Sequence, residues 1–166
     1  VPVTVGAVRL APLAPTFTTR GTSIIDPSGQ VWRPQGANRS GDQLAADGGG
    51  AFNRFGHEGE SMWRWGMSAV RLPINQELWL ADCPVQYSWV HDTPQRPDGS
   101  SWRYRDVIDE EVRRFTARGL LVVLDLHATS RGAATECTAD GHALMEMPDI
   151  RSLDFWTGVA SRYRSQ

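Results

Sequence analysis

The chain has 166 residues, of which 40% are hydrophobic and 22% charged, as is typical of a globular domain with an apolar core. It carries 17 basic and 19 acidic residues, so there is no basic excess to neutralise nucleic-acid phosphates. No run approaches the roughly 20 apolar residues that a membrane span requires.

Residues 1–16 are small, apolar and proline-bearing but have no basic leader, so we expect a linker or a segment that follows a cleaved signal peptide. Residues 17–166 are expected to form one partial domain. Phe17 to Ile25 alternates loosely, and Asp26-Pro27-Ser28-Gly29 suits a type I turn. Val31 resumes an extended run, which predicts a small β-hairpin leading into Gly36-Ala37-Asn38.

Three strand–helix pairs are expected after the hairpin. Glu58 to Trp65 predicts a short helix ended by Gly66. Ser68 to Pro73 predicts a short strand, followed by a long loop from Ile74 to Trp102. The spacing of Tyr104, Ile108, Val112 and Phe115 predicts a helix that ends before Gly119.

A continuously apolar strand from Leu120 to Leu124 follows and is typical of a parallel sheet covered on both faces. A second long loop, from Ala128 to Pro148, precedes a last helix that begins near Asp149 or Ser152. We expect its apolar face to carry Leu153, Trp156, Ala160 and Tyr163. This order of elements predicts an α/β fold with a parallel sheet. No nucleotide-binding glycine motif follows any strand, which favours a barrel over a doubly wound sheet.

Three polar residues lie on or at the end of these strands. Arg71 interrupts an apolar strand, where it either forms a structural ion pair or holds an active-site carboxylate ionised. Asp125 and His127 are two residues apart and point to the same side, where the strand meets its loop. A satisfied core histidine is the plain alternative. A metal site is weakly indicated, because the other histidines have no ligand spacing.

Tryptophan is abundant, with 7 residues. Trp63, Trp65 and Trp156 are most simply core or helix-packing residues. Trp79, nearest the end of a strand, is our preferred platform on which a sugar ring could stack, although it could equally pin down its own loop.

Several motifs resemble glycoside hydrolase family 5 in order and spacing. Ser68-Ala69-Val70-Arg71-Leu72-Pro73 resembles the second barrel strand of that family, and Gly119 to His127 resembles its third. Gly36-Ala37-Asn38 is similar to the first strand, and Asp26 to Gln30 to the hairpin at the barrel floor. Met147-Pro148-Asp149 with Phe155-Trp156 is similar to the start of the third helix. The resemblance covers residues 17–166.

The resemblance implies the N-terminal part of a TIM barrel: a hairpin and about three βα units, truncated before strand four. It implies a secreted, monomeric, cofactor-free glycosidase that retains anomeric configuration and acts on β-linked polysaccharide such as cellulose or β-glucan. Arg71 and His127 would belong to its catalytic machinery, and Asn38 to the substrate site, with Trp79 as the sugar platform.

The family places its acid/base glutamate in an Asn-Glu-Pro motif on strand four and its nucleophile on strand seven, and neither motif occurs here. Since a retaining glycosidase needs two carboxyl groups, we expect this chain alone to be inactive and poorly soluble. Cys83 and Cys137 fall in the loops after strands two and three, so we hypothesise a disulfide between them. The alternatives are a non-catalytic sugar-binding module and a metal-dependent barrel hydrolase that uses Asp125 and His127.

Overall fold

The structure, a computed structural model, describes residues 17–40, 58–83, 99–100, 102–129 and 148–164. The chain divides into two compact units, one comprising Val1–Arg33 with Val159–Gln166 and the other Pro34–Gly158. Within the described ranges, no helix combines the length and the apolar character that crossing a membrane requires. The strands are β1 (Thr18–Arg20), β2 (Ser23–Ile25), β3 (Val31–Trp32), β4 (Gly36–Asn38), β5 (Ala69–Asn75) and β6 (Leu121–Ala128). The helices are α1 (Glu58–Arg64), α2 (Gln76–Ala81), α3 (Tyr104–Thr116) and α4 (Ser152–Tyr163).

The N-terminal strands form an antiparallel sheet in the order β1-β2-β3. The predicted turn is present: one Asp26 carboxylate oxygen accepts hydrogen bonds from the backbone N–H groups of Ser28 and Gln30 at 2.8 and 3.0 Å. The stretch expected as one strand from Phe17 to Ile25 is instead two strands. The chain reverses at Gly21, whose φ of 59° is a conformation that glycine adopts without strain.

The second sheet is parallel, with the order β4-β5-β6. Gly36, Ala37 and Asn38 pair with Ala69, Val70 and Arg71, and β5 pairs with β6 along its whole length. The prediction of strands that run side by side in one direction is therefore confirmed.

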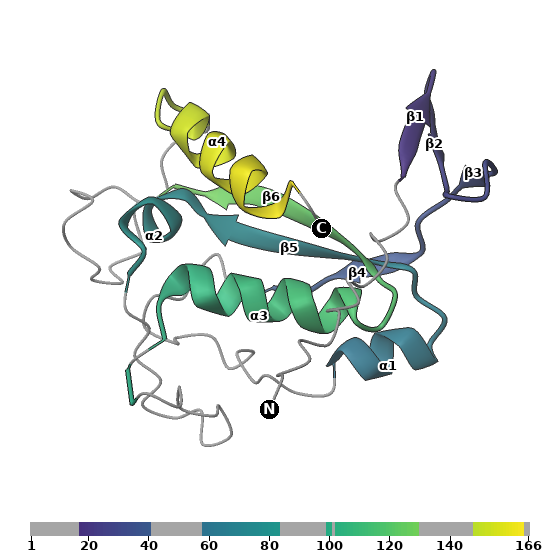
Figure 1. Cartoon of the computed structure of the whole chain (residues 1–166), viewed down its shortest axis with the longest axis horizontal. Helices are drawn as coiled ribbons and strands as arrows, with labels where there is room; N and C mark the ends of the chain where they lie inside the picture. Colours follow the sequence, from purple (N-terminus) through teal and green to yellow (C-terminus); the bar gives the residue numbers. More distant parts are fainter. Residues whose placement is uncertain (1–16, 41–57, 84–98, 101, 130–147, 165–166) are drawn as a thin grey trace, which may run out of the picture. The chain divides into compact units, whose positions relative to one another are not determined.

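Helix α3 covers one face of this sheet and packs against β6 (Figure 1). Its four predicted stripe residues are all at least 95% buried, as are Val70, Leu72 and Ile74 on alternate positions of β5. Gly119 follows the helix with a φ of 78°, as expected of a residue that ends one. The spacing of apolar residues was sufficient to predict this helix and its buried face, because α3 has a single strong apolar stripe.

Helix α2 lies where the sequence after Pro73 predicts a loop. Asn75 ends β5 and caps α2, and its side-chain oxygen accepts hydrogen bonds from the backbone N–H groups of Glu77 and Leu78 at 2.9 and 3.3 Å. Arg105 donates to the carbonyls of Trp79 and Leu80 at the other end of the helix. Both ends of this short helix are thus satisfied by side chains.

Helix α4 begins at Ser152, one of the two expected positions, but buries a different face. Phe155 is fully buried, while Leu153 and Trp156 of the expected stripe are 67% and 42% exposed. The prediction was wrong because Ser152 and Phe155 form an alternative stripe with the same helical spacing. Phe155 packs edge-on against Trp79, with ring centroids 6.0 Å apart.

Gly36 lets β4 approach β5 closely. A Cβ atom added at this position would lie 2.0 Å from the carbonyl oxygen of Ala69, far inside van der Waals contact. The residue is nevertheless exposed to solvent. Only glycine fits this pairing, which sets the position of Asn38 two residues later.

Candidate functional site

The three parallel strands bring four polar side chains together: Asn38 from β4, Arg71 from β5, and Asp125 and His127 from β6. We call these four residues the strand-end cluster. Asn38 and Arg71 are direct partners in the register, while Asp125 lies one pleat further along, opposite Pro73. Because side chains alternate along a strand, Arg71 and Asp125 share the face opposite the buried Val70, Leu72 and Ile74. The register shifts beyond Leu126, and the contact of His127 with Asp125 places the histidine beside them.

Arg71 is the centre of this cluster. Its Nη1 donates to Asn38 Oδ1 at 3.3 Å, and its Nη2 forms an ion pair with Asp125 Oδ2 at 2.7 Å. The guanidinium therefore links all three strands. The two interpretations of Arg71, a structural ion pair and a residue that keeps an active-site carboxylate ionised, both predict a carboxylate partner. Within the described residues that partner is Asp125.

The histidine contacts the same carboxylate. His127 Nδ1 lies 3.0 Å from Asp125 Oδ2 and 3.4 Å from Arg71 Nη2. The side chains of Arg71, Asp125 and His127 are 38%, 22% and 46% exposed. This histidine is therefore not a satisfied core residue, because nearly half of its ring faces solvent.

Two residues of the cluster, Asn38 and Arg71, line a hollow of about 380 Å³. Its wall is formed by strand residues and by the segment that leads into β4: Pro34, Gly36, Ala37, Asn38, Ala69, Val70, Arg71 and Val123. Val123, level with Arg71 in the register, is 45% exposed. The lining of the hollow is thus mainly apolar, and its polar side chains are Asn38 and Arg71.

The strand-end cluster keeps unused hydrogen-bonding capacity. Arginine has five N–H donors and asparagine two. Among the described residues, the partners of Arg71 are only Asn38, Asp125 and His127, and the Asn38 amide N–H groups have none. One cation and one carboxylate leave the cluster without net charge when the histidine is neutral. Such a site suits a neutral ligand rich in hydroxyl groups.

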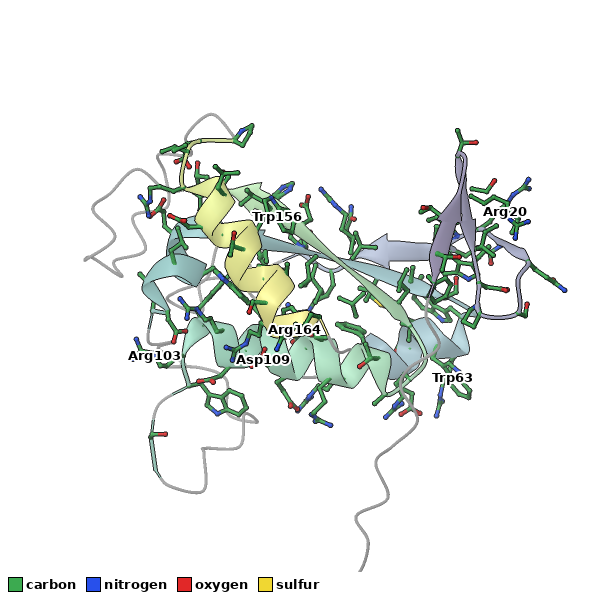
Figure 2. The ribbon with its side chains drawn as sticks, turned by 45° about the horizontal axis from the view of Figure 1, so that its top comes forward. Arg20, Trp63, Arg103, Asp109, Trp156 and Arg164 are labelled. Carbon is green, nitrogen blue, oxygen red and sulfur yellow. The ribbon has the colours of Figure 1, made fainter. Side chains whose placement is uncertain are left out.

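The predicted sugar platform Trp79 does not lie in this site. It is only 2% exposed, because α2 turns it inward against Phe155, and Gly158 lies so close that an added Cβ atom would be 3.2 Å from its Nε1. The prediction for Trp79 is therefore wrong. Two tryptophans expected in the core are instead exposed. Trp63 projects from α1 (Figure 2) and is 58% exposed. Trp65 is 78% exposed.

A second polar group escaped the sequence analysis. Gln76, fully buried at the start of α2, donates to Asp149 Oδ1 at 2.9 Å and accepts from the Ser152 hydroxyl at 2.7 Å. We call these three residues the helix-anchor cluster. The hydrogen bond from Gln76 is the largest cause that lowers the pKa of Asp149 below its ordinary value of 3.8. Arg151 forms an ion pair with Glu77 beside it.

A sequence signal for the helix-anchor cluster existed in part. Asp149 followed three residues later by Ser152 is a capping pattern, and Asp149 Oδ1 accepts the backbone N–H groups of Arg151 and Ser152. No sequence pattern indicated that Gln76 is buried, since glutamine is common in loops and the sequence predicts a loop at this position.

The predicted disulfide joins a described residue to one outside the described ranges. Cys83 is 2% exposed and disulfide-bonded. Its backbone carbonyl accepts a hydrogen bond from the N–H of Tyr104 at 2.8 Å, which ties the end of α2 to the start of α3. Cys137 lies outside the described residues, so its pairing with Cys83 stays a prediction.

Within the described ranges, no group of three or more His, Cys, Asp or Glu side chains could hold a metal ion. Comparisons of the chain with protein-family models, with curated proteins and with solved protein structures find no match.

Proposed function

We propose that the chain is the N-terminal part of a TIM-barrel glycoside hydrolase similar to family 5, acting on a β-linked polysaccharide. The observation that carries the proposal is the link from Arg71 to Asn38 at 3.3 Å and to Asp125 at 2.7 Å, with His127 beside it. These side chains come from three adjacent parallel strands: Asn38 ends β4, His127 is the last residue but one of β6, and Arg71 is the third of the seven residues of β5. Barrel enzymes place their chemistry at the carboxyl ends of their strands.

The chemistry of the cluster favours a sugar over a charged metabolite. A phosphate or carboxylate ligand would meet Arg71 already paired with Asp125, so little unbalanced positive charge remains to attract it. Hydroxyl groups can both donate and accept, and they match the unused N–H groups of Arg71 and Asn38. The hollow of about 380 Å³ lies within the usual size range of ligand pockets.

In this proposal each side chain has a separate role. Arg71 donates a remaining N–H group to a carboxylate supplied by a later strand, because a hydrogen bond to the ionised form favours that form even though Asp125 already balances the charge of the guanidinium. Asn38 and His127 bind sugar hydroxyl groups at the same edge. The disulfide-bonded Cys83 supports secretion, since oxidising compartments favour such bonds.

A second candidate, sugar binding without hydrolysis, is favoured by one observation. Asp125 is the sole carboxylate of the strand-end cluster, and it is engaged by both Arg71 and His127. Retaining hydrolysis requires two carboxyl groups about 5–5.5 Å apart. The described residues therefore provide a binding surface at this site but no such pair.

Two experiments test the proposals. The protein encoded by the complete reading frame should release reducing sugar from soluble β-glucan, and its Arg71→Met variant should lose at least 100-fold of that activity. Arg20→Met, on the exposed strand β1, is the matched control and should retain it. An inactive protein that still binds cellohexaose, with affinity lost on Arg71→Met, supports the binding module. A protein that neither binds nor hydrolyses the glucan contradicts both.

A further inference from the structure

The oxygen Asp125 Oδ2 is shared by two neighbours. Arg71 Nη2 donates to it at 2.7 Å, and His127 Nδ1 lies 3.0 Å from it. Asp125 pairs with Pro73, whereas His127 lies at an irregularity of the register, because Leu126 and Ala128 pair with the adjacent residues Ile74 and Asn75. The contact between carboxylate and imidazole thus joins two residues of one strand across this irregularity.

The contact determines which ring nitrogen carries the proton. A neutral imidazole has one N–H and one lone pair, and an ionised carboxylate can only accept. A lone pair on Nδ1 would face the lone pairs of Asp125, which is repulsive, whereas an N–H there makes a charge-assisted hydrogen bond.

Arg71 favours the opposite arrangement, since its Nη2 is a donor and lies 3.4 Å from the same Nδ1. At that distance a hydrogen bond is weak, while 3.0 Å is a normal separation. Arg71 Nη2 also has a better acceptor in Asp125 at 2.7 Å. The hydrogen bond to the Asp125 carboxylate is therefore the stronger of the two interactions, and it favours the tautomer with the proton on Nδ1.

We propose that Asp125 is a positioning residue that holds His127 as the Nδ1–H tautomer and so presents the Nε2 lone pair as an acceptor. Among the described residues, none hydrogen-bonds Nε2, and the ring is 46% exposed. Nε2 is then the one strong acceptor that the histidine offers to a ligand hydroxyl. This last step, the identity of the ligand, rests on the proposed sugar-binding function; the tautomer does not.

The tautomer is measurable by ¹⁵N NMR of histidine-labelled protein, because protonated and bare ring nitrogens resonate far apart. The His127 signals are identified by their loss in His127→Gln. In the unchanged chain, Nδ1 should have the shift of an N–H nitrogen and Nε2 that of a bare nitrogen. The reverse pattern would overturn the proposal.

Three variants separate the contributions. Asp125→Ala leaves Arg71 as the only partner of Nδ1, so the proton should move to Nε2 and the two shifts should exchange. Asp125→Asn retains an oxygen acceptor and should restore the original pattern at least in part. Arg71→Met keeps the carboxylate and should leave Nδ1 protonated. This variant tests whether Asp125 alone is sufficient to hold the tautomer, even if Asp125→Ala does not fold. Asp154→Ala, an exposed aspartate of α4, is the control and should change nothing.

Cellohexaose binding separates this inference from the function on which it partly rests. If the sugar binds, Asp125→Ala should weaken it about tenfold, the effect of one well-placed hydrogen bond. If the tautomer is as proposed but no sugar binds, the proposed function fails and the positioning role stands. A variant with the exchanged tautomer and unchanged sugar affinity contradicts the role of Nε2.

Discussion

The helix-anchor cluster and the strand-end cluster both consist of polar side chains from segments far apart in the sequence, but they differ in burial. Gln76 is fully buried, and both its amide oxygen and its amide nitrogen have partners within α4 and its leading turn. Arg71 is 38% exposed and keeps donors that no described residue uses. A buried polar group must be satisfied internally, whereas a half-exposed one can hold capacity in reserve for a ligand. The comparison therefore separates a polar group that stabilises the fold from one available for function.

The largest expected effect on stability comes from the helix-anchor cluster. Gln76→Ala should lower the free energy of unfolding by about 3 kcal/mol, because it removes the nearer acceptor of the buried Ser152 hydroxyl and opens a cavity. Urea denaturation measures this loss. The same change at the exposed Gln30 is the control and should have little effect. A loss below about 1 kcal/mol would mean that the buried contacts do not hold α4 in place.

Arg71→Met should affect stability less, by about 1 kcal/mol, because the ion pair that it removes is partly exposed to solvent. Its main effect should be on ligand binding. The same urea titration tests this difference, with Arg20→Met as the control. A loss as large as that of Gln76→Ala would show that the strand-end cluster mainly stabilises the fold. The two clusters would then not differ in role.

A smaller, pH-dependent effect is expected at Asp149. Its pKa is lowered in the folded state, chiefly by the hydrogen bond from Gln76. The ionised carboxylate therefore contributes stability above the unfolded-state pKa, near 3.8, and this contribution is lost as the pH falls through the folded-state pKa.

The check is the difference in unfolding free energy between the unchanged chain and Asp149→Asn. This difference should be largest near neutral pH and should shrink below about pH 4, towards the ordinary pKa of aspartate. Gln76→Ala should remove most of the pH dependence. A difference that stays constant from pH 6 to pH 3 would contradict this assignment.

The smallest effect is expected from an ion pair with short contacts whose arginine is mostly exposed. Arg113 is 65% exposed and lies 2.6 Å from Glu110 on the surface of α3. Arg113→Ala should change the unfolding free energy by less than about 0.5 kcal/mol, because solvent screens the pair. Thermal unfolding of the variant beside the unchanged chain measures this. A loss above 1 kcal/mol would show that the distance between the charged groups, and not their burial, determines how much these ion pairs contribute to stability.

The sequence was informative where one physical requirement dominated. The parallel strands and α3 followed from apolar spacing, and the shared face of Asp125 and His127 followed from alternation along a strand. Direct contact of Arg71 with Asp125 depended on the register between β5 and β6, which no local pattern specifies.

The predictions that were wrong concern features that depend on contacts between distant segments or on elements too short to have a period. Helix α2 is too short for periodicity, and its signal was the cap at Asn75, directly at the end of a strand. Two stripes of α4 satisfy the same helical spacing, and the choice between them depends on Trp79, which packs against Phe155. Trp79 was misplaced because the helix that turns it inward had not been recognised.

Gly36 has a consequence for mutational scanning. It lies on the surface and carries no functional group, yet even a methyl group there would act as a wedge between β4 and β5. Every substitution should therefore displace Asn38 from Arg71 and reduce ligand binding. A scan would report this glycine as an exposed, intolerant position, the profile usually attributed to a residue that touches substrate. Its importance is steric, because β4 can pair this closely with β5 only if the position has no side chain.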